Sequence, residues 1–178
     1  MRDKINEGFV LWFTGLPCSG KTTVADMAAE KLKEKGRKTE RLDGDIVRES
    51  LSSDLGFSRE DRAENIRRVI SVAKKLSLDG TGVITTFVSP YRDMRRKARV
   101  SISNFIEVYA ECPLEECEKR DVKGMYKKAR KGEIENFTGV SDPYEVPENP
   151  EIIIHTSRET PRESCARVMG YLERNGYI

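Results

Sequence analysis

The sequence predicts a three-layer α/β fold in which a parallel sheet of about five strands has helices on both faces. Two observations support this prediction. Short apolar or β-branched segments alternate with longer amphipathic segments along the whole chain, which is typical of βαβ units. A glycine-rich segment at residues 15–22 also lies between the first apolar segment and the first amphipathic one, at the point where such folds bind ligands.

The glycine-rich segment reads Gly-Leu-Pro-Cys-Ser-Gly-Lys-Thr and matches the phosphate-binding pattern G-x-x-x-x-G-K-[ST]. Residues 9–13 before it predict a strand, and the apolar spacing over 24–32 predicts a helix after it. Glycine is needed in such a loop because successive N–H groups turn inward to hold phosphate oxygens. We expect a P-loop in which Lys21 bridges the outer phosphates and Thr22 binds Mg²⁺. The alternative is a glycine turn that binds nothing.

The composition indicates one domain, spanning residues 1–178, with a well-solvated surface. Lys plus Arg (32) nearly balance Asp plus Glu (30), so the charge gives no indication of nucleic-acid binding. Four of the first seven residues are charged and the apolar segment after them is short, so we expect neither a signal peptide nor a membrane span, and a cytoplasmic location. The four cysteines lack C-x-x-C spacing and are expected to be free thiols.

Residues 37–42 predict a second strand that ends in an acidic turn, Asp43-Gly44-Asp45. Ligands of open α/β sheets bind at the carboxyl ends of the strands, so both carboxylates are expected to face the P-loop. The alternative is that Asp45 only caps a short helix over 46–51.

A long helix is predicted next, from a capping box at residues 58–61 to a stop near Gly80. The polar loop before it contains one aromatic residue, Phe57. Arg62 and Asn65 lie three residues apart near the helix start, on a face from which they could reach a ligand. A solvated surface is the plainer interpretation of such charges.

Residues 83–88 predict a third strand and residues 105–112 a fourth. Ser89 is expected at the edge of the crevice, where its simplest role is to cap a helix over 91–101 that has Pro90 at its first position.

Residues 114–132 predict one helix with a cationic side and an apolar side. Folded over the P-loop, together with the residues up to about 139, this helix would clamp polyphosphate as a lid. A solvated helix is the alternative. The cationic residues are Arg120, Lys123, Lys127 and Arg130, and the apolar ones are Val122, Tyr126 and Ala129.

The remaining segments are a Pro-rich surface loop over 143–150, a short buried strand over 152–154 and a helix over 159–175. Phe137 precedes the loop and has no periodic apolar pattern around it. His155, the only histidine, belongs to no Cys/His cluster and is expected to be structural.

Three classes of P-loop protein fit this layout: small-molecule kinases, switch GTPases and nucleic-acid-directed ATPases. The guanine-reading N-K-x-D motif of GTPases is absent. A helicase-like ATPase would need a longer chain and basic patches interleaved with aromatic residues. The early acidic turn and the basic lid favour phosphoryl transfer to a small acceptor.

Six segments together resemble the adenylylsulfate kinase family, which uses ATP to phosphorylate the 3′-hydroxyl of adenosine 5′-phosphosulfate (APS). They are residues 15–22, 42–45, 61–68, 87–92, 120–130 and 137–139, and they span most of the chain in the family's order. The resemblance implies ATP and Mg²⁺ as cofactors. The residues that would contact ATP are Gly15, Leu16, Pro17, Cys18, Ser19, Gly20, Lys21, Thr22, Thr23 and Arg120.

The same resemblance implies an acceptor site that suits a dianionic nucleotide, with cations for phosphate and sulfate and aromatic faces for adenine. Arg48, Arg62 and Asn65 would hold the phosphosulfate, and Phe57 and Phe137 would stack on the adenine. The further acceptor contacts would be Asp43, Asp45, Val88, Ser89, Lys123 and Lys127.

The resemblance also assigns catalytic roles to Asp45, Lys21 and Ser89. Asp45 would orient or deprotonate the attacking hydroxyl, while Lys21, Thr22 and Mg²⁺ neutralise the transferred charge. Ser89 matches a serine often described as forming a phosphoenzyme. We expect it to hold the acceptor instead, because direct in-line transfer needs no covalent relay.

The implied partner is the small molecule APS, with no nucleic acid and no membrane. A homodimer and a functional link to sulfate adenylyltransferase are left open. Two alternatives for the function also stay open: a kinase for gluconate, shikimate or a nucleoside monophosphate, and a nucleotide-binding regulator without catalytic activity.

Overall fold

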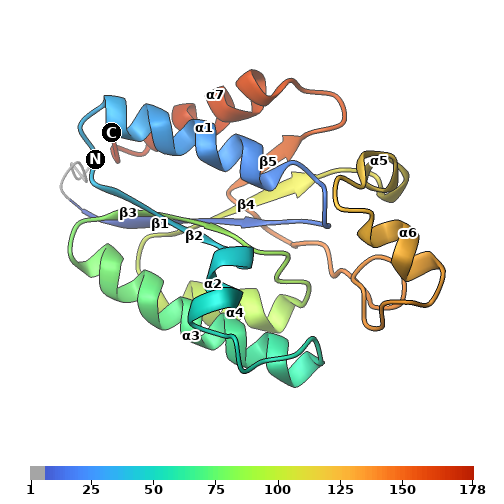
Figure 1. Ribbon diagram of the computed structural model, residues 1–178. Helices are drawn as coiled ribbons and strands as arrows, with labels where there is room; N and C mark the ends of the chain where they lie inside the picture. Colours follow the sequence, from blue (N-terminus) through green and yellow to red (C-terminus); the bar gives the residue numbers. More distant parts are fainter. Residues whose placement is uncertain (1–6) are drawn as a thin grey trace.

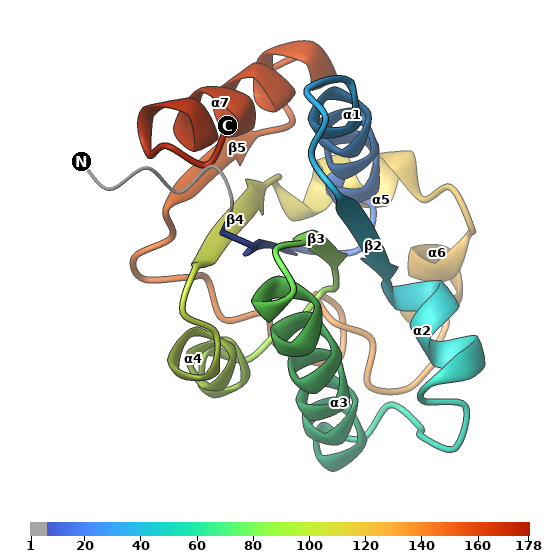
Figure 2. The ribbon, with the colours of Figure 1, turned by 90° about the vertical axis from the view of Figure 1, so that its left-hand side faces the viewer.

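The computed structural model describes residues 7–178 and has the expected three-layer architecture (Figure 1). Within these residues, five parallel strands form one sheet in the order β2-β3-β1-β4-β5. Helices α1 and α7 cover one face, and α3 and α4 cover the other (Figure 2). The strands are β1 (Phe9–Thr14), β2 (Thr39–Asp43), β3 (Gly82–Thr86), β4 (Phe105–Glu111) and β5 (Ile152–His155). The helices named here are α1 (Lys21–Glu34), α3 (Arg59–Leu78), α4 (Arg92–Ser101) and α7 (Pro161–Arg174).

The central strand β1 fixes the position of the P-loop, because all six of its residues are buried. Phe9, Leu11 and Phe13 pack under α1 and α7, whereas Val10 and Trp12 pack against α3 and α4. A strand of a parallel sheet that is covered on both faces is apolar throughout, as predicted here. The loop that follows β1 is therefore anchored in the most rigid part of the fold.

The start of α4 differs from the prediction. The helix begins at Arg92, and Ser89 does not cap it. The N–H of its first residue, Arg92, donates to the distant Glu145 Oε2 at 2.7 Å. The Ser89 Oγ instead accepts a hydrogen bond from Trp12 Nε1 at 3.1 Å. A capping residue 53 positions away leaves no local signal in the sequence.

The short helix α2 (Gly44–Ser50) is capped by Asp43 and not by Asp45. The Asp43 Oδ1 accepts from the Asp45 N–H at 3.0 Å, and its Oδ2 accepts from Thr86 Oγ1 at 2.7 Å. The capping role considered for Asp45 is therefore wrong, and its carboxylate is left exposed.

The predicted lid helix is two helices, α5 (Leu114–Arg120) and α6 (Met125–Arg130). Helical geometry ends at Asp121, and Gly124 has a φ of 67°. The Asp121 carboxylate caps α6 by accepting from two backbone N–H groups there. Val122 lies in the break and is 84% exposed, so the apolar side predicted for one continuous helix was wrong at this residue.

The edge of the sheet at β5 is covered on one face only. Ile152 and Ile154 are buried, but Ile153 is exposed, which corrects the expectation of a wholly buried strand. Helix α7 starts two residues later than predicted, behind a capping box formed by Thr160 and Glu163. Among residues 7–178, not one helix combines the length and the apolar character that crossing a bilayer requires.

Candidate active site

The P-loop follows β1 at the carboxyl edge of the sheet and leads directly into α1. Gly15 has a φ of 150°, and a Cβ added there would lie 2.7 Å from the Ala110 carbonyl oxygen. Gly20 has a φ of 84° and precedes the first residue of α1. Both positions thus need glycine for the chain to turn tightly around an anion. The N-terminus of α1 adds its positive dipole end to the same place.

Lys21 lies over this loop and is largely buried. Its Nζ donates to the carbonyl oxygens of Gly15 and Leu16 at 2.9 and 2.6 Å, and to Ser19 Oγ at 3.3 Å. Burial lowers the pKa of Lys21 to about 8. A bound polyanion would favour the charged form of this amine, which is therefore placed to act as an anion ligand.

A cavity of 540 Å³ opens on the outer side of the P-loop. Arg120 forms its wall, where one guanidinium nitrogen donates to the Thr156 carbonyl at 2.6 Å and the other to the Cys18 carbonyl at 3.3 Å. The Thr156 Oγ1 in turn donates to the Ser19 carbonyl at 2.8 Å. Cys18, Ser19, Gly20, Lys21, Thr22, Thr23, Val24, Arg120, Val122, Thr156, Glu159, Pro161 and Ser164 line this cavity.

Val24 and Val122 of this lining were predicted only as apolar helix residues, and four later lining residues were not predicted as site residues either: Thr156, Glu159, Pro161 and Ser164. They lie after β5 and at the start of α7. The only signal for them was the rule that ligands bind beyond the carboxyl ends of parallel strands. No motif marks them.

Few protein groups at this site could bind a metal ion. Across residues 7–178, no group of three or more His, Cys, Asp or Glu side chains is placed to hold a metal ion. Mg²⁺ in phosphoryl-transfer sites takes one or two protein ligands and otherwise phosphate oxygens and water. The exposed Thr22 hydroxyl, next to Lys21 on α1, fits that pattern.

The two acidic residues of the predicted turn are not equivalent. Both oxygens of Asp43 accept hydrogen bonds within the fold, as described for α2. The Asp45 side chain is 74% exposed, and its ion-pair partner among the described residues is Lys123 from the break between α5 and α6. Asp45 is thus the carboxylate that an incoming ligand can reach.

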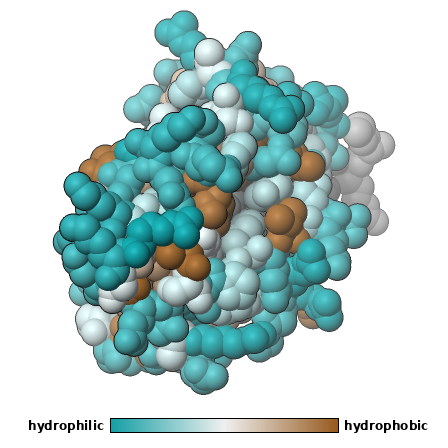
Figure 3. Space-filling model, turned by 90° about the vertical axis from the view of Figure 1, so that its right-hand side faces the viewer, coloured by the Kyte–Doolittle hydropathy of each residue, from teal (hydrophilic) through white to brown (hydrophobic). Residues whose placement is uncertain are grey.

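Phe57 contacts Arg48, which lies on the same short helix α2 as Asp45. The Arg48 guanidinium lies 4.2 Å from the centroid of the Phe57 ring and donates to the Gly56 carbonyl at 2.9 Å. The Phe57 ring is more than half exposed. Figure 3 shows this carboxyl edge of the molecule, where a few exposed apolar side chains lie among hydrophilic ones.

Arg62 joins the Phe57 loop to the segment that carries Phe137. Its Nε donates to the Phe57 carbonyl at 2.9 Å, its Nη1 donates to Thr138 Oγ1 at 3.1 Å, and its Nη2 donates to the Asn136 carbonyl. Phe137 packs edge-on against Tyr126 of α6, with ring centroids 4.9 Å apart. Arg62 therefore sets the spacing between the two aromatic segments.

The other residues predicted to contact the acceptor differ in exposure. Asn65 is buried, and its Oδ1 has no hydrogen-bond partner in the part of the chain that the structure describes. Val88 and Ser89 lie at the turn after β3, and Ser89 is 3% exposed. Lys127 is exposed on α6.

His155 and the cysteines take no part in the cavity wall except for Cys18. The His155 Nδ1 pairs with the carboxylate of Glu111, the last residue of β4. The free-thiol prediction is confirmed for Cys18, Cys112, Cys117 and Cys165.

Comparison with known proteins adds to this geometry. A family model described as "Adenylylsulphate kinase" matches residues 7–155. The adenylyl-sulfate kinase of Halothermothrix orenii is 56% identical over 172 residues, which is 97% of this chain and 93% of the relative. A solved APS kinase of Mycobacterium tuberculosis, in complex with AMPPNP and APS, has a TM-score of 0.90 at 44% identity, covering 94% of this chain and 98% of the other. A gluconokinase from Sinorhizobium meliloti, at 15% identity and a TM-score of 0.61 over 97% and 94% of the two chains, shares only the fold.

Proposed function

The chain belongs to the adenylylsulfate kinase family, and it is an ATP-dependent kinase that converts APS and ATP to 3′-phosphoadenosine 5′-phosphosulfate and ADP. We propose how its residues carry out this transfer. The observation that supports the scheme best is the position of Asp45. Its exposed carboxylate lies beyond the end of β2, where Lys123 of the lid meets it. We infer that the acceptor hydroxyl binds there.

In this scheme the P-loop residues 15–23 hold the triphosphate through backbone N–H groups, and Lys21 contacts the outer phosphates. Arg120 and the cavity wall around Thr156 enclose the rest of the nucleotide. Thr22 would hold Mg²⁺, which supplies positive charge to the phosphate oxygens when it is bound. The main work of these residues is positioning and electrostatic stabilisation.

The acceptor would bind on the other side of Asp45. Phe57 and Phe137 supply faces for the adenine ring, at a spacing set by Arg62. Arg48, Asn65, Lys123 and Lys127 supply donors and positive charge for the phosphosulfate, with Asp43, Val88 and Ser89 completing the contacts. Asp45 accepts the proton of the 3′-hydroxyl as that oxygen attacks the γ-phosphorus in line.

A coupled assay of ADP release tests the acceptor directly. We expect turnover with APS, and at most background with gluconate, shikimate or AMP. Faster turnover with another acceptor would overturn the proposal, and no turnover with any of the four would favour a regulator without catalytic activity.

Ser89→Ala is expected to retain substantial turnover, within about tenfold of the unmodified enzyme, because the loss of one neutral hydrogen bond costs about 0.5–1.5 kcal/mol. Ser89 Oγ is buried and accepts from Trp12 Nε1. The chain's only histidine pairs with Glu111, so it is engaged elsewhere and does not serve as a base for this hydroxyl. Steady-state kinetics measures the effect. Rapid-quench recovery of a kinetically competent phosphoserine from the unmodified enzyme would contradict it.

ATP binding is expected to take up protons at alkaline pH. The free protein loses the Lys21 proton as pH rises through about 8, whereas bound phosphate favours the charged amine. Binding at pH 9 should therefore take up close to one proton, binding at pH 6.5 should take up none at this group, and ATP affinity should fall above pH 8. Titration calorimetry in buffers of different ionisation enthalpy measures the uptake. Equal uptake at both pH values, or uptake that persists in Lys21→Met, would be the contrary result.

Assembly and pathway partners are a separate part of the proposal. A homodimer and a functional link to sulfate adenylyltransferase stay predictions of the sequence. Sedimentation equilibrium of the purified chain tests the first, and co-purification with that enzyme tests the second.

A further inference from the structure

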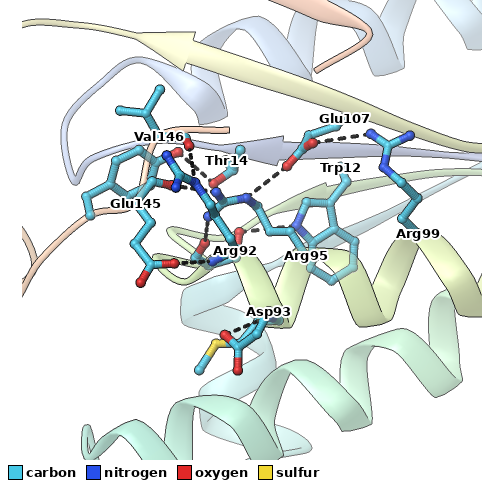
Figure 4. A network of polar contacts seen from close by, with 12 residues as sticks. Trp12, Thr14, Arg92, Asp93, Arg95, Arg99, Glu107, Glu145 and Val146 are labelled. Atoms are coloured by element: carbon cyan, nitrogen blue, oxygen red, sulfur yellow. Dashed lines mark hydrogen bonds and ion pairs between the residues drawn. The ribbon is translucent and has the colours of Figure 1, made fainter. Parts of the chain in front are cut away.

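Four hydrogen bonds hold the turn formed by residues 88–90, and Figure 4 shows the polar network around it. Ser89 has a φ of 38°, which is uncommon for a residue with a side chain. Its Oγ accepts from Trp12 Nε1 at 3.1 Å, and the Val88 carbonyl accepts from Thr14 Oγ1 at 2.8 Å. The Ser89 carbonyl accepts from Arg95 Nη1 at 2.6 Å. Glu145 donates its N–H to the Pro90 carbonyl at 2.8 Å.

Arg95 is the residue that joins this turn to the Pro-rich loop. Its second terminal nitrogen donates to the Glu145 carbonyl. Its guanidinium also lies 5.6 Å from the ring centroid of Tyr144, whose hydroxyl is 2.9 Å from Thr14 Oγ1. One buried side chain thus bonds to both Ser89 and Glu145, which are 56 positions apart in the sequence.

The charge of Arg95 is balanced inside the fold by Glu107 of β4. Nε lies 2.8 Å from Glu107 Oε1, and both side chains are less than a tenth exposed. The pair is an ion pair without a well-aligned hydrogen bond, because Oε1 receives none. Arg99 lies 3.2 Å from the other oxygen of Glu107 and also pairs with Glu151. Arg99 belongs to the same network, but it contacts Glu107, Glu151 and the Phe105 ring and not the turn.

We propose that Arg95 is a positioning residue for the acceptor nucleotide. Its guanidinium donates to the Ser89 and Glu145 carbonyls. These bonds keep Val88 and Ser89 in the position from which they would contact the acceptor. This inference rests on the proposed function, which assigns Val88 and Ser89 to the acceptor. A guanidinium fork can serve two carbonyls and a carboxylate at once, whereas a lysine amine keeps the charge but lacks the fork.

Arg95→Lys and its matched control Arg99→Lys distinguish positioning from a structural role. Both variants alter the same buried network and are expected to lower the thermal midpoint of unfolding. The KM for APS should rise about tenfold in Arg95→Lys only, with the KM for ATP within about twofold of the unmodified value, because one hydrogen bond to a charged group is lost. Equal KM values for APS in the two variants, or a parallel rise for ATP, would overturn the inference.

A second variant keeps the test decisive if Arg95→Lys folds poorly. Arg95→Met combined with Glu107→Gln removes both buried charges together, so no unpaired charge is left. Stability should recover relative to Arg95→Met alone, while the raised KM for APS persists. Recovery of both stability and KM would mean that Arg95 only balances Glu107. Absence of turnover of APS by the unmodified enzyme would instead be a failure of the proposed function, visible before any variant is made.

Discussion

Replacing Asp45 by asparagine is expected to lower kcat about 10³-fold, the usual scale of a lost general base. Asparagine keeps the size of the side chain but cannot accept the proton of the acceptor hydroxyl. The ATP affinity should change little, because the P-loop holds the phosphates independently of this residue. The exposed position of Asp45 also means that the substitution leaves the core intact.

Glu49→Gln is the matched control for this variant. Glu49 lies on the same helix, four residues later, and is also exposed. It should turn over APS like the unmodified enzyme. Initial rates with APS and equilibrium binding of ATP measure both quantities. Normal turnover in Asp45→Asn would remove Asp45 from the mechanism.

Replacing Lys21 by methionine is expected to lower kcat by about 10³-fold as well, because one preorganised charge on the transferred phosphoryl group is lost. Methionine fills the space of the aliphatic stem, so the loop should keep its shape. The backbone N–H groups still hold the phosphates, so the Kd for ATP should rise much less than kcat falls.

Lys31→Met serves as the control for Lys21→Met. It removes the same charge from the exposed far end of α1. Single-turnover rates and calorimetric Kd values separate catalysis from binding in both variants. Equal losses in kcat and ATP affinity for Lys21→Met would mean that this lysine only binds the nucleotide.

The elements that the sequence predicts well are those with a local cause. The apolar run of β1, the glycines of the P-loop and the N-cap at Ser58 each depend on neighbouring residues, and each occurs where expected, although the Asp61 carboxylate accepts from the Ser58 hydroxyl and does not complete the predicted capping box. The cap of α4 by Glu145 and the break of the lid at Gly124 are different cases. The Glu145 cap depends on a residue that is distant in the sequence. The break at Gly124 lies within the regular spacing of cationic residues over 120–130, and that spacing gives no sign of it.

The same distinction holds at the candidate site. Asp45 follows β2 at the expected place, although the roles of all predicted site residues stay predictions. The cavity wall at Thr156 and Pro161 was not predicted, because tertiary folding brings it to the P-loop from the last part of the chain. Arg62 was predicted to contact the ligand. Its hydrogen bonds to the Phe57 and Asn136 carbonyls and the Thr138 hydroxyl could be seen only in the structure.

The position of Trp12 gives the protein an intrinsic optical probe. It is the only tryptophan in the chain, it is fully buried, and its indole N–H donates to Ser89. Indole emission depends on the polarity and hydrogen bonding around the ring, so a ligand that shifts the Ser89 turn changes the signal without any attached dye. Trp12 is hydrogen-bonded directly to Ser89, one of the residues proposed to contact the acceptor. Its fluorescence therefore offers a way to follow acceptor binding in real time during turnover.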